Sequence, residues 1–453
     1  MKRILKWIGI AVMTPVLLFI ILAVLLYLPP VQNWAVKKVA AIASEKTGME
    51  ITIEHVNLEF PLDLGIEGLR ALHTRPALPS GSSGSDSLPD VKDTIADIRK
   101  LVVDVKLRPL FRHQVIIDEL SLQQAKINTN GFISDLRIKG EMQELWLSSK
   151  GIDLKKETAM VNGARMRDGW LDINLTDTAA VDTTASTAKW VIKADSISLS
   201  NTRLTINMPD DSLHMATHFG EAVARDVSID IAQKTYQVGD IDWQNGSITY
   251  NNSWAQKITR LKGGVKIDST SVSLPNLILK TPDSDIEGEL AMDFNAFDEH
   301  HPGLMKMRLN AQLGKQDLLQ FLGEMPRKFT ERFPNHPLSI KGSINGNMKQ
   351  MEFTGLNICL PTALQLTADG SAENIADPKS LKADIRLKAK AEDLNFVTAL
   401  VDPKLQRNYR IPYGLTLDGS IKADGTTYGA DLTMRDGNGT VRLKGDAAIP
   451  RNT

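Results

Sequence analysis

Cysteine is almost absent from the sequence, which has a single residue of this type, Cys359. One cysteine cannot form an internal disulfide, and a position between Ile358 and Leu360 is typical of a small apolar core residue. The sequence also lacks an excess of either charge, because its 53 Lys and Arg residues are balanced by 54 Asp and Glu residues. The chain therefore has no basic excess to neutralise a phosphate backbone, which argues against nucleic acid as a partner.

The sequence also lacks the motifs of common catalytic and metal sites. It contains no GxSxG, no P-loop and no GxGxxG after a strand, and its eight histidines show no HExxH or HxH spacing. His300 and His301 are predicted to lie in an exposed turn, and the segments 283–285 and 436–440 lack the glutamate of an EF-hand loop. We therefore predict no catalytic residue, no cofactor and no metal site, and a protein that is not an enzyme.

A long uncharged run from Trp7 to Leu28 follows Lys2, Arg3 and Lys6. Its roughly 22 residues would form a helix that crosses the ~30 Å hydrocarbon layer of a membrane. A cleaved signal peptide is the alternative, but it would have a shorter apolar core and a small-residue cleavage site. We predict an uncleaved single-pass anchor with a cytoplasmic N-terminus. Its membrane-facing residues would include Trp7, Leu17, Phe19, Leu25 and Leu28.

A short amphipathic helix beside the membrane is predicted over residues 31–48. Gly48 stands where the left-handed residue after a helix is expected. Apolar residues recur before it at helical spacing. They are Val31, Trp34, Ala35, Val39, Ile42 and Ala43.

From residue 49 onward the apolar period changes from 3.6 to 2, which predicts β-structure. The dipeptides Asp168-Gly169 and Asn245-Gly246 and the segment 436–439 are predicted to be hairpin turns of a meandering antiparallel sheet. Segments 76–89 and 177–187 are predicted to be inserted loops. The clearest alternation is found in 51–53, 103–107, 171–175, 227–231, 288–294, 307–311, 415–418 and 441–444.

An internal repeat is predicted near the C-terminus. A strand, a helix-like segment at Asp317, a proline-led turn and a glycine-centred strand follow one another over 307–344, and the same order recurs over 385–421 around Asp393. Residues 447–453 follow a strand without a capping element, so we expect a longer protein or a capping partner. We divide the chain into an anchor (1–30), a juxtamembrane helix (31–48), a repetitive β-groove (49–300) and its continuation with two repeats (301–453).

The chain resembles the AsmA-like superfamily, and within it the TamB-type translocation and assembly module proteins. The resemblance lies in the anchor, the helix, the segment Thr47–Pro61 and the glycine-centred segments 342–346 and 419–422. It implies a body in the periplasm, anchored in the inner membrane, with an elongated β-groove (β-taco-like) that passes phospholipids between the membranes. It also implies a contact with an outer-membrane barrel protein, although the long C-terminal part that TamB proteins use for this contact is missing here.

The period-2 apolar residues are the candidates for a lipid-binding lining, because only two short helix-like segments are predicted to shield so many one-sided strands. The open alternative is that these residues fill a closed sandwich or solenoid core. A second function, assembly of client proteins by strand addition to an exposed sheet edge, also stays open, and an envelope hydrolase or adhesin is a third. The predicted lining residues are Leu290, Met292, Phe294, Met307, Leu309, Leu338, Ile340, Ile344, Leu415, Leu417 and Ile421.

Overall fold

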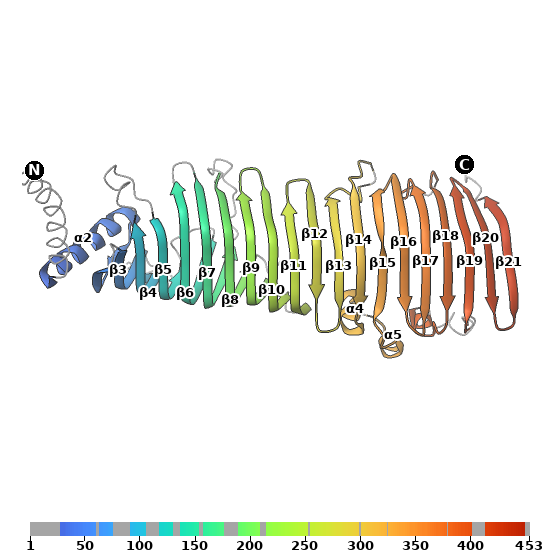
Figure 1. Cartoon of the computed structure of the whole chain (residues 1–453), viewed down its shortest axis with the longest axis horizontal. Helices are drawn as coiled ribbons and strands as arrows, with labels where there is room; N and C mark the ends of the chain where they lie inside the picture. The colour runs from blue at the N-terminus through green and yellow to red at the C-terminus, as the bar shows by residue number, and fades with distance from the viewer. Residues whose placement is uncertain are drawn as a thin grey trace, which may run out of the picture. The chain divides into compact units, whose positions relative to one another are not determined.

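The computed structural model describes residues 28–59, 63–75, 91–105, 117–129, 136–153, 157–175, 189–208, 214–251, 254–298, 300–323, 325–377, 379–400 and 413–448. They form 21 strands and a few short helices (Figure 1), which confirms the mainly β prediction. The predicted anchor helix ahead of Leu28 and the two predicted loops lie outside these residues.

The helical elements are α2 (Pro29–Thr47), α4 (Lys315–Leu322), α5 (Arg327–Arg332) and the 3-10 turn η2 (Val397–Leu400). The strands are β1 (Glu50–Thr52), β2 (His55–Glu59), β3 (Asp63–Arg75), β4 (Val91–Val105), β5 (Ile117–Asn128), β6 (Leu136–Asp153), β7 (Thr158–Leu175), β8 (Val191–Asn207), β9 (His214–Asp230), β10 (Thr235–Tyr250), β11 (Trp254–Ile267), β12 (Ser271–Lys280), β13 (Asp285–Asp293), β14 (Met305–Leu313), β15 (Leu338–Asn347), β16 (Gln350–Leu360), β17 (Leu364–Glu373), β18 (Lys382–Ala391), β19 (Leu415–Asp424), β20 (Thr427–Asp436) and β21 (Gly439–Ala448).

All strands belong to one sheet, which is mostly antiparallel. Within the described residues β21 pairs only with β20, so the sheet does not close on itself. The chain forms two compact units, and each is described by itself. Unit 1 comprises Met1–Glu221 and Thr249–Ser253, and unit 2 comprises Ala222–Ile248 and Trp254–Thr453.

Helix α2 confirms the predicted helix at the start of unit 1. It begins at Pro29, whose fixed φ suits a first helical turn, and it ends before Gly48, whose backbone is left-handed (φ 69°). The Ser44 hydroxyl oxygen accepts a hydrogen bond from the Ile51 N–H at 3.0 Å, which connects the helix to the strand region. No helix in the described part of the chain is long and apolar enough to cross a membrane.

The strands of unit 1 follow one another in a ladder. Strands β1 and β2 both pair with β3, and β3 to β7 pair in antiparallel order. Strand β8 then joins β7 in parallel, which a simple meander does not contain. This unit has its own small core, made of the buried Leu122, Ala125, Met142 and Met166.

Two of the predicted hairpin turns are wrong. Asp168-Gly169 lies in the middle of β7, and Asn245-Gly246 lies inside β10. Asp168 and Asn245 have left-handed backbones, with φ of 49° and 52°. The β6–β7 ladder lacks a pair at Asp168, but the pairs Met142–Gly169 and Glu144–Arg167 on either side keep the same register, so neither strand gains a residue there. Asp and Asn tolerate the left-handed conformation inside a strand as well as in a turn, so the dipeptide alone does not separate the two.

The predicted turn at 436–439 is confirmed in unit 2, where it joins β20 to β21. The Asp436 carboxylate accepts hydrogen bonds from the N–H groups of Asn438 and Gly439 at 2.8 and 2.9 Å. These hydrogen bonds hold the pKa of Asp436 below its usual range. Strands β11 to β21 of this unit pair in antiparallel order along the chain.

The predicted helical segments of unit 2 are found in part. Helix α4 contains Asp317, as expected, but the segment at Asp393 forms only the 3-10 turn η2. Helix α5 was not predicted; its six residues are too few to show an apolar period, and it begins after Pro326. In Figure 1 α4 and α5 lie at one end of the neighbouring strands.

Candidate functional site: an uncovered apolar face

The register of unit 2 places apolar residues of neighbouring strands side by side. Leu290 of β13 pairs with Met307 of β14, which pairs with Ile344 of β15. Residues that pair directly across an antiparallel ladder share one face of the sheet. Leu309 lies two residues along β14 and is therefore on the same face as Met307. We call this surface the apolar face.

The apolar face continues without a break to β19. Ile344 pairs with Phe353, Phe353 with Gly370, Gly370 with Ile385, and Ile385 with Ile421. The predicted lining residues that lie in strands are therefore all on one face, and these are Leu290, Met292, Met307, Leu309, Leu338, Ile340, Ile344, Leu415, Leu417 and Ile421.

The remaining predicted site residues lie elsewhere. Phe294 follows the last residue of β13 and is 56% exposed at the strand end. Leu28, the only described residue of the predicted anchor set, precedes α2 and is 45% exposed. The other four anchor residues, Trp7, Leu17, Phe19 and Leu25, lie outside the described residues.

The predicted lining residues in the strands are half-buried, except Ile421, which is 39% exposed. Exposed and partly buried positions alternate along β18. One face of this strand is therefore solvent-exposed, and the residues of the other face are shielded only by side chains of the adjacent strands. No large side chain in the described part of the chain is fully buried. A closed sandwich would bury many such side chains between its two layers. Within the described residues the sheet is therefore a single layer, and no second sheet covers its apolar face.

One end of the apolar face is covered by the helices. Phe329 and Phe333 around α5 pack against Phe396, with ring centroids 5.2–5.6 Å apart. Together with Leu360 and Ala363 they form a buried cluster, against which the partly buried Leu338 of β15 packs. Among the described residues this cluster covers the ends of the strands.

Asp317 fixes α4 to the sheet. Its carboxylate accepts hydrogen bonds from the hydroxyls of Thr281 and Ser284, in the β12–β13 turn, and from the Gln256 amide at 2.9 Å. Desolvation raises the pKa of Asp317, but the hydrogen bonds from Ser284, Thr281 and Gln256 outweigh it, so the pKa is lowered. Asp317 also lies in the first turn of α4, where the helix dipole favours a negative charge.

Glycines occupy positions on the apolar face in three strands of unit 2. Gly342, Gly370 and Gly419 have φ of 154°, 156° and 155°, which an L side chain rarely adopts. A Cβ on Gly419 would lie 2.0 Å from the Asp431 carbonyl oxygen, and one on Gly370 would lie 2.2 Å from the Asp384 carbonyl oxygen. The backbones of adjacent strands approach closely here because no side chain separates them.

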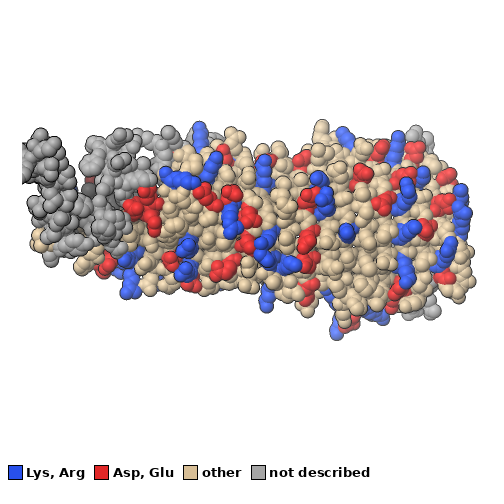
Figure 2. Space-filling view, in the orientation of Figure 1, with Lys and Arg blue, Asp and Glu red and all other residues tan. Residues whose placement is uncertain are grey.

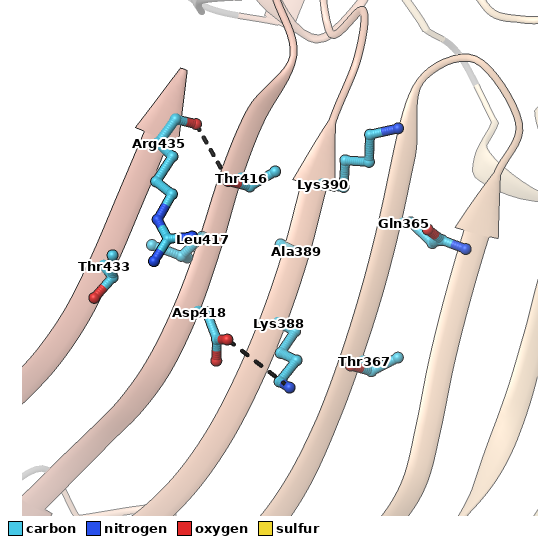
Figure 3. Close-up of a pocket in the computed structure, with 10 residues that line it drawn as sticks. All are labelled: Gln365, Thr367, Lys388, Ala389, Lys390, Thr416, Leu417, Asp418, Thr433 and Arg435. Atoms are coloured by element: carbon cyan, nitrogen blue, oxygen red, sulfur yellow. Dashed lines mark hydrogen bonds and ion pairs between the residues drawn. The ribbon is translucent and has the colours of Figure 1, made fainter. Parts of the chain in front are cut away.

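The opposite face of unit 2 is polar, and Figure 2 shows Lys and Arg interspersed with Asp and Glu across it. Open hollows lie between these side chains. One of about 350 Å³ is lined by Lys388, Lys390, Asp418, Arg435 and their neighbours (Figure 3). Lys388 and Asp418 lie 3.8 Å apart, and Lys390 binds Glu392 at 2.6 Å. The hydrogen bond that Lys390 donates to the Glu392 carboxylate raises the pKa of Lys390.

The described residues contain no group of three or more His, Cys, Asp or Glu that could hold a metal ion. Comparison with known protein families finds no family that matches this chain, and comparison with curated proteins finds no match either. No family is identified. The similarity to AsmA-like proteins is therefore carried only by the residues quoted above.

The sequence pattern did not reveal the local irregularities in the strands of unit 1. In β5 the buried Leu122 and Ala125 are three residues apart, and in β6 Met142 and Leu145 have the same spacing. The two residues between them both lie on the polar side, although the β5–β6 register does not shift there, so neither strand gains a residue. A spacing of three inside a period-2 pattern is the signal that could have predicted these irregularities.

Proposed function

We propose that the apolar face binds the acyl chains of membrane phospholipids, and that the protein is a periplasmic lipid-transfer conduit anchored in the inner membrane. The observation that supports this proposal is the continuous row of mostly half-buried apolar residues, which no second layer covers within the described part of the chain. The resemblance to AsmA-like proteins suggests the same function. An outer-membrane barrel protein as the distal partner rests on that resemblance alone.

The physical need for such a surface follows from hydrophobic transfer energies. An acyl chain of about 16 carbons costs on the order of 12 kcal/mol to move through water at ~0.8 kcal/mol per CH₂. A continuous apolar face removes most of this barrier at every step of the path. Aliphatic side chains without directional groups also hold a chain with similar strength at each row, so the lipid can slide.

The apolar face has no groups that could react with a lipid. Its residues are Leu, Ile, Met, Phe, Ala and Gly, which supply contact area but no nucleophile or general base. The charged groups lie on the opposite face, where opposite charges pair, as in Lys422 with Asp384 at 3.0 Å. We therefore propose a carrier without catalysis.

Leu309→Asp and Leu417→Asp test this proposal, because each places a charge on the apolar face. We expect both variants to stay folded and to lose most of the phospholipid that co-purifies with the wild type, as measured by native mass spectrometry. Transfer of labelled phospholipid between vesicles should fall about tenfold or more, since a charge in an apolar path costs at least ~1.4 kcal/mol.

Arg308→Asp and Thr416→Asp are the matched controls, because they place the same charge one residue away on the polar face. They should leave the bound lipid unchanged. If the wild type carries no phospholipid, or if the two pairs of variants lose lipid equally, the conduit proposal is wrong. Circular dichroism separates loss of binding from loss of fold.

The alternative function is a scaffold that assembles client proteins by strand addition. Strand β21 has every residue exposed and, within the described part, one unpaired edge. It also carries Arg442 and Lys444, and charges of this kind on an edge strand oppose pairing with another chain. Binding of unfolded barrel peptides by a lipid-free wild type would favour this alternative.

A further inference from the structure

A second hollow, in unit 1, has the composition of a ligand site. It lies on the polar side of β6 to β9 and has a volume of about 800 Å³, within the range of about 300–1,000 Å³ found for small-molecule sites. Thr205 lies among its lining residues and is only 7% exposed. Thr205 is therefore shielded by the taller side chains around it, which form the walls of an open hollow.

The parallel pairing of β7 and β8 assembles the site. It sets Trp170 beside Arg203, Asp172 beside Thr205 and Asn174 beside Asn207. These residues share the polar side, because Leu171 and Leu204 between them pair on the apolar side. The side chains of the two strands therefore lie side by side in three successive rows on this face.

A hydrogen-bond network orders one wall of this hollow. The Asn207 amide donates to the Asp172 carboxylate at 2.8 Å and to the Asn174 side-chain oxygen at 2.7 Å. The Asn207 oxygen lies 2.5 Å from Nδ1 of His214 on β9. The carboxylate and amide groups are thus held in place before any ligand arrives, which lowers the entropy cost of binding.

Other polar groups in the hollow are left without partners. Within the described residues the side chains of Arg203 and His218 make no hydrogen bond and no ion pair, although both line the hollow. The Trp170 ring lines it as well, with the Lys139 ammonium 5.9 Å from the ring centroid. An indole, a guanidinium, an imidazole and an ordered carboxylate therefore face the same space.

We infer that this hollow binds a saccharide. A sugar carries hydroxyl groups that both donate and accept hydrogen bonds, which matches Arg203 as donor and Asp172 as acceptor. The C–H side of a sugar ring is flat and apolar, which suits stacking on an indole ring such as that of Trp170. Charges of both signs surround the hollow, so a neutral sugar fits better than a strongly charged ligand. This inference is independent of lipid binding on the apolar face.

The test uses the purified full-length chain and three soluble probes, maltotetraose, cellotetraose and chitotetraose, with binding followed by saturation-transfer NMR and calorimetry. We expect at least one probe to bind, and Trp170→Ala and Arg203→Ala each to weaken its affinity about tenfold or more. Arg203 is exposed, so its removal should not affect folding.

Trp146→Ala is the matched control. Trp146 lies on the polar side of β6 and also has a cation near its ring, Arg165 at 5.5 Å, but its indole N–H is already bonded to Glu119. This variant should bind the sugar as the wild type does.

A second experiment distinguishes a lipid-linked saccharide from a free one. It measures binding to phosphatidylcholine vesicles that contain a galactosyl lipid. Binding only in this arm, with the same loss in Arg203→Ala, assigns the sugar to a glycolipid. No binding in either arm, or equal loss in the Trp146 and Trp170 variants, overturns the inference.

Discussion

At the residue scale, single glycines determine how closely the backbones of adjacent strands in unit 2 can approach one another. Gly419 lies on the apolar face opposite Leu387 and Leu432 and has a positive φ. An added Cβ there would meet backbone, which cannot move aside as a side-chain end can. The strain must therefore be relieved by shifting the strand itself.

Gly419→Ala is expected to lower the free energy of unfolding by about 1–3 kcal/mol, because the residue loses its permitted φ and clashes with the Asp431 carbonyl. Gly445→Ala is the control, since a Cβ there has nothing within 4 Å. Urea unfolding followed by circular dichroism measures both. Equal stability of the two variants would show that the sheet does not need the close approach at Gly419.

At the element scale, α4 depends on one carboxylate for its position. Asp317→Asn should cost about 1–2 kcal/mol at neutral pH, because hydrogen bonds to a charged acceptor become hydrogen bonds to a neutral one. Hydrogen exchange of the α4 amides measures the loosening. Unchanged protection of α4 in this variant would contradict the role given to Asp317.

The pH dependence of this effect has a definite sign. The pKa of Asp317 is lower in the folded state than its ordinary value, so its contribution to stability is present above that ordinary value and is lost as the pH falls through the folded pKa. The difference in α4 protection between wild type and Asp317→Asn should therefore be largest near neutral pH. It should shrink when the pH is lowered below about 4.

Much of the element order could be predicted from the sequence, and the failures have local causes. Alternation in 307–311 and 415–418 places β14 and β19 correctly, because one face of each strand is wet and the other apolar. Asp168-Gly169 does not form the predicted turn, because a left-handed Asp also occurs inside a strand. The parallel β7–β8 pair could not be predicted, since side-chain alternation is the same in both pairing directions.

The candidate sites were predictable to different degrees. The strand residues of the apolar face, such as Leu309 and Leu417, follow from period 2 and lie on one face as that pattern requires. The hollow at Trp170 and Arg203 could not be predicted from the sequence, because these residues are 33 positions apart and become neighbours only through the β7–β8 register. Sequence pattern gives the face of a residue, but only pairing gives its neighbours.

At the scale of the whole molecule, a ladder of strands should not unfold as one cooperative body. Buried side chains gather in separate clusters, Phe329, Phe333, Leu360, Ala363 and Phe396 in unit 2 and Leu122, Ala125, Met142 and Met166 in unit 1. Strands β4 to β7 contact the strands beside them in the ladder. Stability in such an array is a sum of local and nearest-neighbour contributions.

Phe396→Ala should therefore destabilise its surroundings by about 3 kcal/mol and lower hydrogen-exchange protection in α5 and the adjacent strand ends. Protection of β5 to β7 should stay unchanged. Met166→Ala should do the reverse, because its buried neighbours all belong to unit 1. Hydrogen exchange with mass spectrometry in rising urea reads both regions in one experiment. If each variant lowers protection in both regions equally, unfolding is global and the additive description is wrong. A cavity in one cluster can lower the unfolding free energy of a distant region only if the two regions unfold cooperatively.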